Sequence, residues 1–391
     1  MRRRVLLAGL TALTLLPATA GAIPAYARRY KVSCQLCHNP VPKLTDFGRT
    51  FAGNGYRMAA EEPPRDTINT GDPLLALQKD LPLAMRLEAY AQAYSKGNVA
   101  TDFATPYLIK LLASGPISKK FSYFMYINLL ERGQFGGFED AFLFYNDIAG
   151  KPVDLLVGQF QVSDPMFKRE SRLMFEDYAL YLMKVGAEPA NLTYDRGLLM
   201  NADVAGFAFT GELLNGNGID NAPDNRTYDD NGFKNLAGYL SRDFGRSLRL
   251  AAFGYYGRSD SEGEQNKVVM FGGDGTLELG IVEFNAQYLH REDTNPLFLT
   301  NGSIVKTDGG LAELIIRPRS GRWHGFGLYN DLRATAPVLS VEFGPEATNR
   351  YQTLTGGLGY LVVRNLKVTG EMRWDFQEDE MRWTLGFVTA F

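Results

Sequence analysis

The chain of 391 residues holds only two cysteines, Cys34 and Cys37, and His38 follows directly behind the second one. Two thiols in a C-x-x-C-H spacing are typical of covalent haem attachment, in which both sulfurs form thioethers and the histidine ligates the iron. A thioredoxin-like redox pair would need a βαβ context, and the surrounding sequence shows none. A zinc site would need four ligands, and only His290 and His324 could add nitrogen. The motif therefore predicts one covalent haem c.

The N-terminus has the pattern of an export signal. Three arginines at positions 2–4 precede an apolar stretch from Val5 to Leu16, and small residues follow it. This order predicts a cleaved signal peptide over residues 1–22. The apolar stretch is too short for a spanning helix. The mature chain is therefore expected outside the cytoplasm, where haem c is attached.

Composition excludes some partners. The chain carries 41 Lys and Arg against 44 Asp and Glu, a net charge of −3. With no basic excess, a nucleic-acid partner is not expected. Glycine (41), tyrosine (20) and phenylalanine (25) are plentiful, and apolar residues occur in short alternating bursts.

The alternation predicts β-strands with two unlike faces. Near the C-terminus Met372 and Trp374 alternate with Glu371 and Arg373. Period two places the two sets on opposite faces of a strand. In a secreted sandwich the apolar face would form the core, whereas in an outer-membrane barrel it faces lipid. A final strand closed by Phe391 resembles the assembly signal of outer-membrane barrels, so we expect a barrel embedded in outer-membrane lipid.

The strand count selects a barrel size. About seventeen candidate strands lie within residues 83–391, whereas single-chain bacterial barrels take even numbers. We assign the candidate at 176–184 to a loop, which predicts an all-β fold with a 16-stranded antiparallel barrel. Residues 162–193 then form one long loop that folds inward as a constriction. Its cations either line that constriction or form an ordinary solvated run: Lys168, Arg169 and Arg172.

The connections between strands alternate in length, as in such barrels. The predicted tight turns lie near 244–245, 273–275, 320–321 and 364–365. The predicted long links lie near 216–233, 257–267, 292–308, 333–352 and 377–381.

Residues 23–58 are expected to form a small cytochrome domain, joined to the barrel by a linker at 59–82. Leu44, Phe47 and Phe51 recur at helical spacing, which predicts a short helix from about Thr45. So few residues make a marginal core on their own. We therefore expect a plug that lies inside the barrel or against its mouth.

Several short motifs resemble one family, the fused cytochrome–porins, which are outer-membrane monohaem c-type cytochromes associated with extracellular iron oxidation. The cytochrome half carries the resemblance in Tyr26 to Tyr30, Cys34 to His38, Pro42 to Thr45, Phe47 to Arg49 and Gly55-Tyr56. The barrel half resembles the phosphate-selective porin type in Gly158 to Phe160, Asp195 to Gly197 and Leu214 to Gly218.

This resemblance implies that Cys34 and Cys37 form the thioethers and that His38 is the proximal ligand. It also implies sixteen strands and electron transfer across the outer membrane. The expected donor is extracellular Fe(II), and the expected acceptor is a periplasmic c-type cytochrome. The corresponding activity is that of an iron:cytochrome c oxidoreductase.

The sixth iron ligand is a separate question. Met58 is the nearest candidate, and a His/Met pair raises the haem potential relative to His/His, which suits an iron oxidase. An open or water-filled sixth site is the alternative. The alternation around His290 and His324 predicts that both side chains face outward, away from the lumen.

Acidic residues in the predicted loops are hard oxygen ligands that suit Fe(II), and they are also ordinary solubilising charges. They are Asp220, Asp224, Asp229, Asp230, Asp260, Glu262, Glu264, Glu378, Asp379 and Glu380. Two other functions remain open at this stage. Electrons could flow outward to an external acceptor, or the chain could be a diffusion porin with a haem-bearing plug. Both a monomer and a trimer fit the sequence.

Overall fold

The computed structural model describes residues 25–58, 67–72, 74–78, 82–219, 227–229, 231–318, 321–341, 347–363 and 365–391. The predicted signal peptide lies outside these residues, as does part of the predicted linker, 59–66. In the described part of that linker, β1 (Thr67–Asn69) pairs with β2 (Ala76–Gln78) in a small antiparallel sheet. None of the described helices has the length and apolar character needed to span a membrane.

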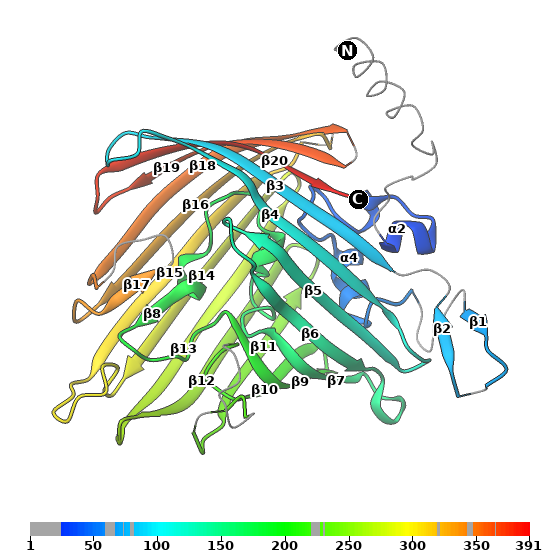
Figure 1. Ribbon diagram of the computed structural model, residues 1–391, viewed down its shortest axis with the longest axis horizontal. Coiled ribbons are helices and arrows are strands. Elements are labelled where there is room, and N and C mark those ends of the chain that lie inside the picture. Colours follow the sequence, from blue (N-terminus) through cyan, green and yellow to red (C-terminus); the bar gives the residue numbers. More distant parts are fainter. Residues whose placement is uncertain are drawn as a thin grey trace, which may run out of the picture.

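Sixteen antiparallel strands close into a barrel, which confirms the predicted count (Figure 1). The strands are β3 (Leu83–Tyr94), β4 (Thr101–Pro116), β5 (Phe121–Glu131), β6 (Gly137–Tyr145), β7 (Val153–Gln161), β9 (Tyr194–Val204), β10 (Phe207–Leu214), β11 (Asn235–Phe244), β12 (Leu248–Ser261), β13 (Glu264–Leu279), β14 (Val282–Asp293), β15 (Val305–Ile316), β16 (Trp323–Ala334), β18 (Arg350–Val363), β19 (Leu366–Asp375) and β20 (Glu380–Ala390). Pairing of β20 with β3, from Arg382↔Tyr94 to Ala390↔Arg86, closes the ring.

The two faces of the strands are reversed relative to a soluble protein. On β19 the polar residues Glu371 and Arg373 are buried, whereas Met372 and Trp374 are 45% and 42% exposed. A closed ring satisfies every strand hydrogen bond, so its apolar outer wall can face hydrocarbon. The alternation therefore marks a membrane barrel, and the secreted sandwich is excluded.

One predicted tight turn is wrong. The glycine run at 273–275 lies inside β13, where Gly273 pairs with Ala252 on one side and Tyr288 on the other. The turn follows at Gly280, which has a positive φ of 64°. Glycine weakens a strand but does not end it when both neighbouring strands supply hydrogen bonds.

One predicted long link is also wrong. Residues 257–267 continue β12 and β13 as a polar hairpin, which turns at Glu262 and Gly263 with φ of 53° and 86°. Two residues with positive φ make the tight turn that suits a twisted hairpin. Strand pairing therefore extends past the apolar band, and Glu264 lies on a strand rather than in a loop.

Residues 162–193 run inside the barrel without adding a strand to its wall. This segment, hereafter the inner loop, contains η2 (Arg169–Ser171), α5 (Ala179–Leu182) and β8 (Met183–Val185). All four residues of α5 are buried. β8 pairs with β17 (Leu339–Val341), which belongs to the connection between β16 and β18. Two connections from one end of the barrel thus meet within the lumen.

We predict that Leu180→Ala loosens the inner loop. Leu180 is 0% exposed within the apolar cluster of the lumen, so its truncation leaves a cavity that costs about 2–4 kcal/mol of unfolding free energy. Urea unfolding in detergent measures the cost, and protease sensitivity of 162–193 locates it. Leu299→Ala, at an exposed position on an external connection, is the matched control. Equal effects of the two variants would contradict this packing.

Candidate functional site

The cysteine motif folds as a single helical turn. α3 (Cys34–Cys37) begins after Ser33, whose hydroxyl caps it, and the His38 amide donates to the Cys34 carbonyl at 2.9 Å. One turn places both thiols at neighbouring positions with the histidine directly beyond them. The local structure therefore keeps the three groups of the motif together.

His38 has its tautomer fixed by a backbone contact. Its Nδ1 lies 2.8 Å from the Pro42 carbonyl oxygen. Because a carbonyl only accepts, Nδ1 carries the proton and the lone pair is on Nε2. Burial lowers the pKa of His38, which favours the neutral imidazole. A neutral ring with one nitrogen held by a carbonyl is the usual form of a metal-ligating histidine.

Helix α4 (Asp46–Gly53) packs directly on this turn. Thr45 caps α4 by accepting from the Gly48 amide, and its hydroxyl also donates to the Leu36 carbonyl at 2.6 Å. A Cβ on Gly48 would lie 2.2 Å from the Cys37 carbonyl oxygen, so only glycine permits this approach. The helix predicted from Thr45 is confirmed.

Aromatic side chains surround α4 and complete a small apolar surface. Phe51 is buried against Tyr26, Tyr30 and Tyr56, with ring centroids 5.0 to 6.1 Å apart. Phe47, on the same helix, stacks on Phe51 and remains partly exposed. A covalent haem needs two thiols, a neutral imidazole as iron ligand and an apolar surface against the macrocycle. The residues present here fit this group.

Residues 25–58, hereafter the plug, contact two walls of the barrel. On one wall Lys43 Nζ lies 2.5 Å from Glu283 Oε1 of β14, and Arg317 donates to the Asn39 carbonyl at 3.1 Å. On the other wall Arg57 donates to the Lys119 carbonyl at 2.5 Å. β14 and β5 are eight strands apart in the ring of sixteen, so these contacts bridge opposite walls.

The plug occupies the end of the barrel with the short turns. Figure 1 shows α2 (Ala25–Tyr30) and α4 beside the end of β20. The contacts named above also fall at the short connections β4–β5 and β15–β16. Short turns face the periplasm in outer-membrane barrels, so the plug lies at the periplasmic mouth. This placement agrees with the shelter that so small a core requires.

His290 points outward as predicted, and its Nδ1 lies 2.8 Å from Asp308 Oδ1 on the outer face. The prediction for His324 is wrong. Its side chain faces the lumen with Phe326 and Leu328, and all three are buried. Here the lumen side is apolar because the inner loop packs against β16. The two-residue alternation of β16 was correct. Which face points to the lumen could not be decided from the sequence, because the inner loop makes the lumen side of this strand apolar.

Met58 ends the plug and is 36% exposed. It follows Arg57, which is held by the β4–β5 turn. Its assignment as a sixth ligand stays a prediction. Within the described ranges no group of three or more His, Cys, Asp or Glu side chains could hold a metal ion.

The cations of the inner loop form ion pairs with carboxylates of the same loop. Lys168 pairs with Asp164, Arg169 Nη2 lies 2.8 Å from Asp177 Oδ2, and Arg172 lies 3.5 Å from the same oxygen. Burial disfavours the charged form of Asp177, but the two arginines outweigh it and hold the pKa of this carboxyl below its ordinary value. These charges stabilise the loop rather than line an open channel.

A second ionic group joins the inner loop to β19 and β20. Glu176 Oε2 lies 2.7 Å from Arg382 and 3.4 Å from Arg373. The backbone amide of Phe175 donates to Glu371 at 2.7 Å. The inner loop therefore has an apolar contact on the β11–β18 wall and an ionic contact on the β19–β20 wall.

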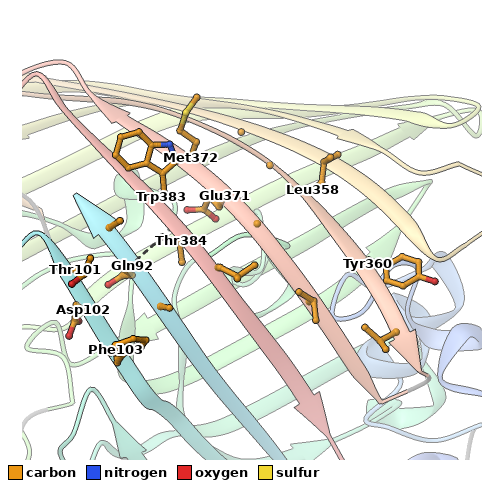
Figure 2. Close-up of a pocket in the computed structure, with 18 of the residues that line it drawn as sticks. Gln92, Thr101, Asp102, Phe103, Leu358, Tyr360, Glu371, Met372, Trp383 and Thr384 are labelled. Carbon is orange, nitrogen blue, oxygen red and sulfur yellow. Dashed lines mark hydrogen bonds between the residues drawn. The ribbon is translucent and has the colours of Figure 1, made fainter. Parts of the chain in front are cut away.

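A shallow groove of about 970 Å³ follows the strands β3, β4 and β16 to β20 (Figure 2). Its exposed apolar side chains, such as Phe103, Leu358 and Leu385, belong to the outer face. Gln92 and Thr384, which share the hydrogen bond drawn in Figure 2, belong to the lumen face behind it. The groove is thus a thin part of the lipid-facing wall and is separate from the plug.

A closed sixteen-stranded barrel with an apolar outer wall defines an outer-membrane β-barrel of porin type. The chain is similar to the anion-selective porin from Comamonas acidovorans, with 11% identity over 80% of this chain and 99% of that one, and a TM-score of 0.59. It is also similar to the outer-membrane channel DcaP of Acinetobacter baumannii, with 12% identity over 80% and 97% of the two chains and a TM-score of 0.56.

A loop-deletion form of OmpT from Vibrio cholerae is similar at 11% identity over 80% and 99% of the chains, with a TM-score of 0.55. No family model and no curated protein sequence matches the chain. At these identities the likeness defines the fold, and it supports a bacterial outer-membrane location. The porins are matched almost whole, whereas a fifth of this chain falls outside the match.

We predict that Gly48→Ala detaches α4 from the cysteine turn. The new Cβ would overlap the Cys37 backbone, so the helix must shift and the plug becomes easier to cleave. Gly53→Ala in the same helix is the control, because a Cβ there meets nothing within 4 Å. Limited proteolysis of residues 25–58 in the detergent-solubilised protein compares the two. Equal cleavage rates would contradict the close approach.

We predict that acid releases the inner loop. The pKa values of Asp177 and Glu170 are lowered in the folded state, so their stabilising effect is complete above the ordinary carboxyl pKa of about 4. It is lost as the pH falls below that value toward the folded pKa. Single-channel conductance should rise in this window, and Asp177→Asn should raise it already at neutral pH. Unchanged conductance in both cases would contradict the conclusion that these ion pairs hold the inner loop in place.

Proposed function

We propose that the chain is an outer-membrane electron conduit in which Cys34, Cys37 and His38 hold one haem c at the periplasmic mouth of the barrel. Electrons pass from extracellular Fe(II) to a soluble periplasmic c-type cytochrome. A haem bound there supplies a one-electron Fe(III)/Fe(II) couple. The observation that carries the proposal is the cysteine–histidine turn docked across the mouth of a barrel whose lumen is filled.

The position of the plug decides which partner approaches from which side. The apolar band of such a barrel is about 25 Å tall. A site at the periplasmic mouth is within reach of a periplasmic protein, whereas the outer surface is far away. Fe(II) must therefore enter the lumen from outside.

Two buried carboxyl groups on the lumen wall offer oxygen ligands to an entering cation. Asp140 of β6 and Glu212 of β10 are buried, and each has a carboxyl oxygen without a hydrogen-bond partner in the described structure. Carboxylate oxygens are suitable ligands for Fe(II) once the carboxyl group has lost its proton.

The inner loop and the plug narrow the lumen, which favours a conduit over a wide diffusion porin. The inner loop makes apolar contacts on one wall and ionic contacts on another, and the plug bridges the mouth below it. Electron export to an external acceptor would use the same haem site, with electrons moving from the periplasm to the outside. Direction depends on the reduction potential of the bound group relative to its partners.

The decisive experiment uses liposomes that contain the purified, haem-loaded protein. In one sample the liposomes contain ferric cytochrome c, and in a parallel sample they contain a chromogenic Fe(II) chelator. Fe(II) is then added outside the liposomes of both samples. We expect reduction of the trapped cytochrome at least tenfold faster than in protein-free liposomes, with little coloured chelate. A conduit passes electrons but not iron.

The matched variant is Cys34→Ser/Cys37→Ser, which keeps the barrel but cannot form thioethers. Its liposomes should reduce the trapped cytochrome at the protein-free rate. Rapid coloration of the trapped chelator by both proteins would instead identify a diffusion porin. Oxidation of trapped ferrous cytochrome by external Fe(III) chelate, without the forward reaction, would identify electron export.

A further inference from the structure

His324 is a buried imidazole without a partner. Its side chain is 2% exposed on the lumen face of β16, and neither Nδ1 nor Nε2 has a hydrogen bond within the described structure. Buried polar groups are almost always hydrogen-bonded, so such an exception calls for an explanation. A missing protein partner destabilises the folded state, and a ligand bond to the imidazole offsets that cost.

This imidazole lies on the wall that holds the cysteine turn. β16 begins at Trp323, directly after the connection in which Arg317 donates to the Asn39 carbonyl. Lys43, close to His38 in the chain, contacts Glu283 on β14. Across the sheet, Glu283 of β14 pairs with Ile315 of β15, and Ile315 pairs with Phe326 of β16. Glu283 and Phe326 are therefore two strand spacings apart, about 10 Å. His324 is two residues from Phe326, toward the mouth.

A series of electrostatic neighbours connects the two histidines. Arg86 of β3 is a neighbour of His38 and also of Lys367 on β19. Lys367 is in turn a neighbour of His324. This series is consistent with both histidines lying at the short-turn end of the barrel.

We infer that His324 supplies the second protein ligand to the iron of the haem that the plug would hold, an inference that rests on the proposed function. The neutral imidazole donates a nitrogen lone pair to the iron, and no proton is lost. The imidazole ring of His324 lies over Gly359, so closely that a Cβ on Gly359 would be 2.2 Å from Nε2. To bind the iron, the ring would rotate about its side-chain bonds toward the centre of the lumen. His290 faces outward and is excluded.

Met58 is the competing ligand, and its surroundings favour it less. It is 36% exposed, and the preceding Arg57 is fixed to the Lys119 carbonyl of the β4–β5 turn. That turn belongs to the wall opposite β14, whereas the residues just after His38 contact the β14–β16 wall. A bis-histidine pair is thus formed by one residue from the plug and one from the barrel.

The test compares the ferric spectra of full-length proteins produced with haem-attachment machinery. Electronic and electron paramagnetic resonance spectra separate six-coordinate low-spin haem from high-spin haem. We expect the wild-type protein and Met58→Leu to be low-spin and His324→Ala to be high-spin. Millimolar imidazole should return His324→Ala to the low-spin form, and His290→Ala should resemble wild type.

Two controls distinguish loss of a ligand from loss of the fold. Heat-modifiable migration on gels reports whether each barrel is folded, and His324→Gln provides a second variant of closer volume. A low-spin His324→Ala protein, or a high-spin Met58→Leu protein, would overturn the inference and leave the conduit standing. A high-spin wild-type protein would also overturn it. Absence of covalent haem from the wild-type chain would overturn both proposals.

Discussion

The contact of the plug with two opposite walls is the constraint on which the rest of the structure depends. Residues 25–58 contain one small aromatic cluster around Phe51, and so short a segment makes a marginal independent domain. Lys43 and Arg57 instead fix the plug to strands eight positions apart. The ring must be closed for both contacts to exist. Closure by β20 and β3, which removes strand edges from the bilayer, therefore also holds the cysteine turn in place.

Much of the fold follows from the sequence, because a lipid-facing strand repeats every two residues and the repeat is visible in segments such as the one around Met372. Sixteen strands and an inner loop that adds no strand to the wall follow from that repeat and from the parity of bacterial barrels. The glycines at 273–275 gave a wrong turn prediction, since only the two flanking strands reveal that pairing continues. The outward prediction for His324 was wrong because an apolar strand face can lie against lipid or against the contents of the lumen. The Cys34–His38 motif is visible in the local spacing alone, whereas the contacts of the plug with Glu283 and Arg317 arise only through tertiary structure.

The surroundings of the mouth would act on the potential of a bound haem in opposite senses. A His/His pair lowers the haem potential relative to His/Met. Burial would raise it, because a low dielectric disfavours the more highly charged ferric state. Arg86 would contribute little, since Glu88 and Glu170 pair with it. Burial is therefore the feature that would allow a bis-histidine site to accept electrons from Fe(II), and the iron ligands alone would not set the direction of flow.

A distal ligand supplied by β16 would also link cofactor chemistry to the order of assembly. Thioether formation at Cys34 and Cys37 needs an accessible chain in the periplasm, before the barrel has closed around the plug. His324 reaches the lumen only once β16 is paired with β15 and β18. The haem would then be five-coordinate or water-ligated during transit and six-coordinate after insertion. Electron transfer would be confined to the folded barrel, because a site without its sixth protein ligand has a different potential and spin state. The partition of the ligands between plug and wall thus limits redox chemistry on an exposed, unassembled chain.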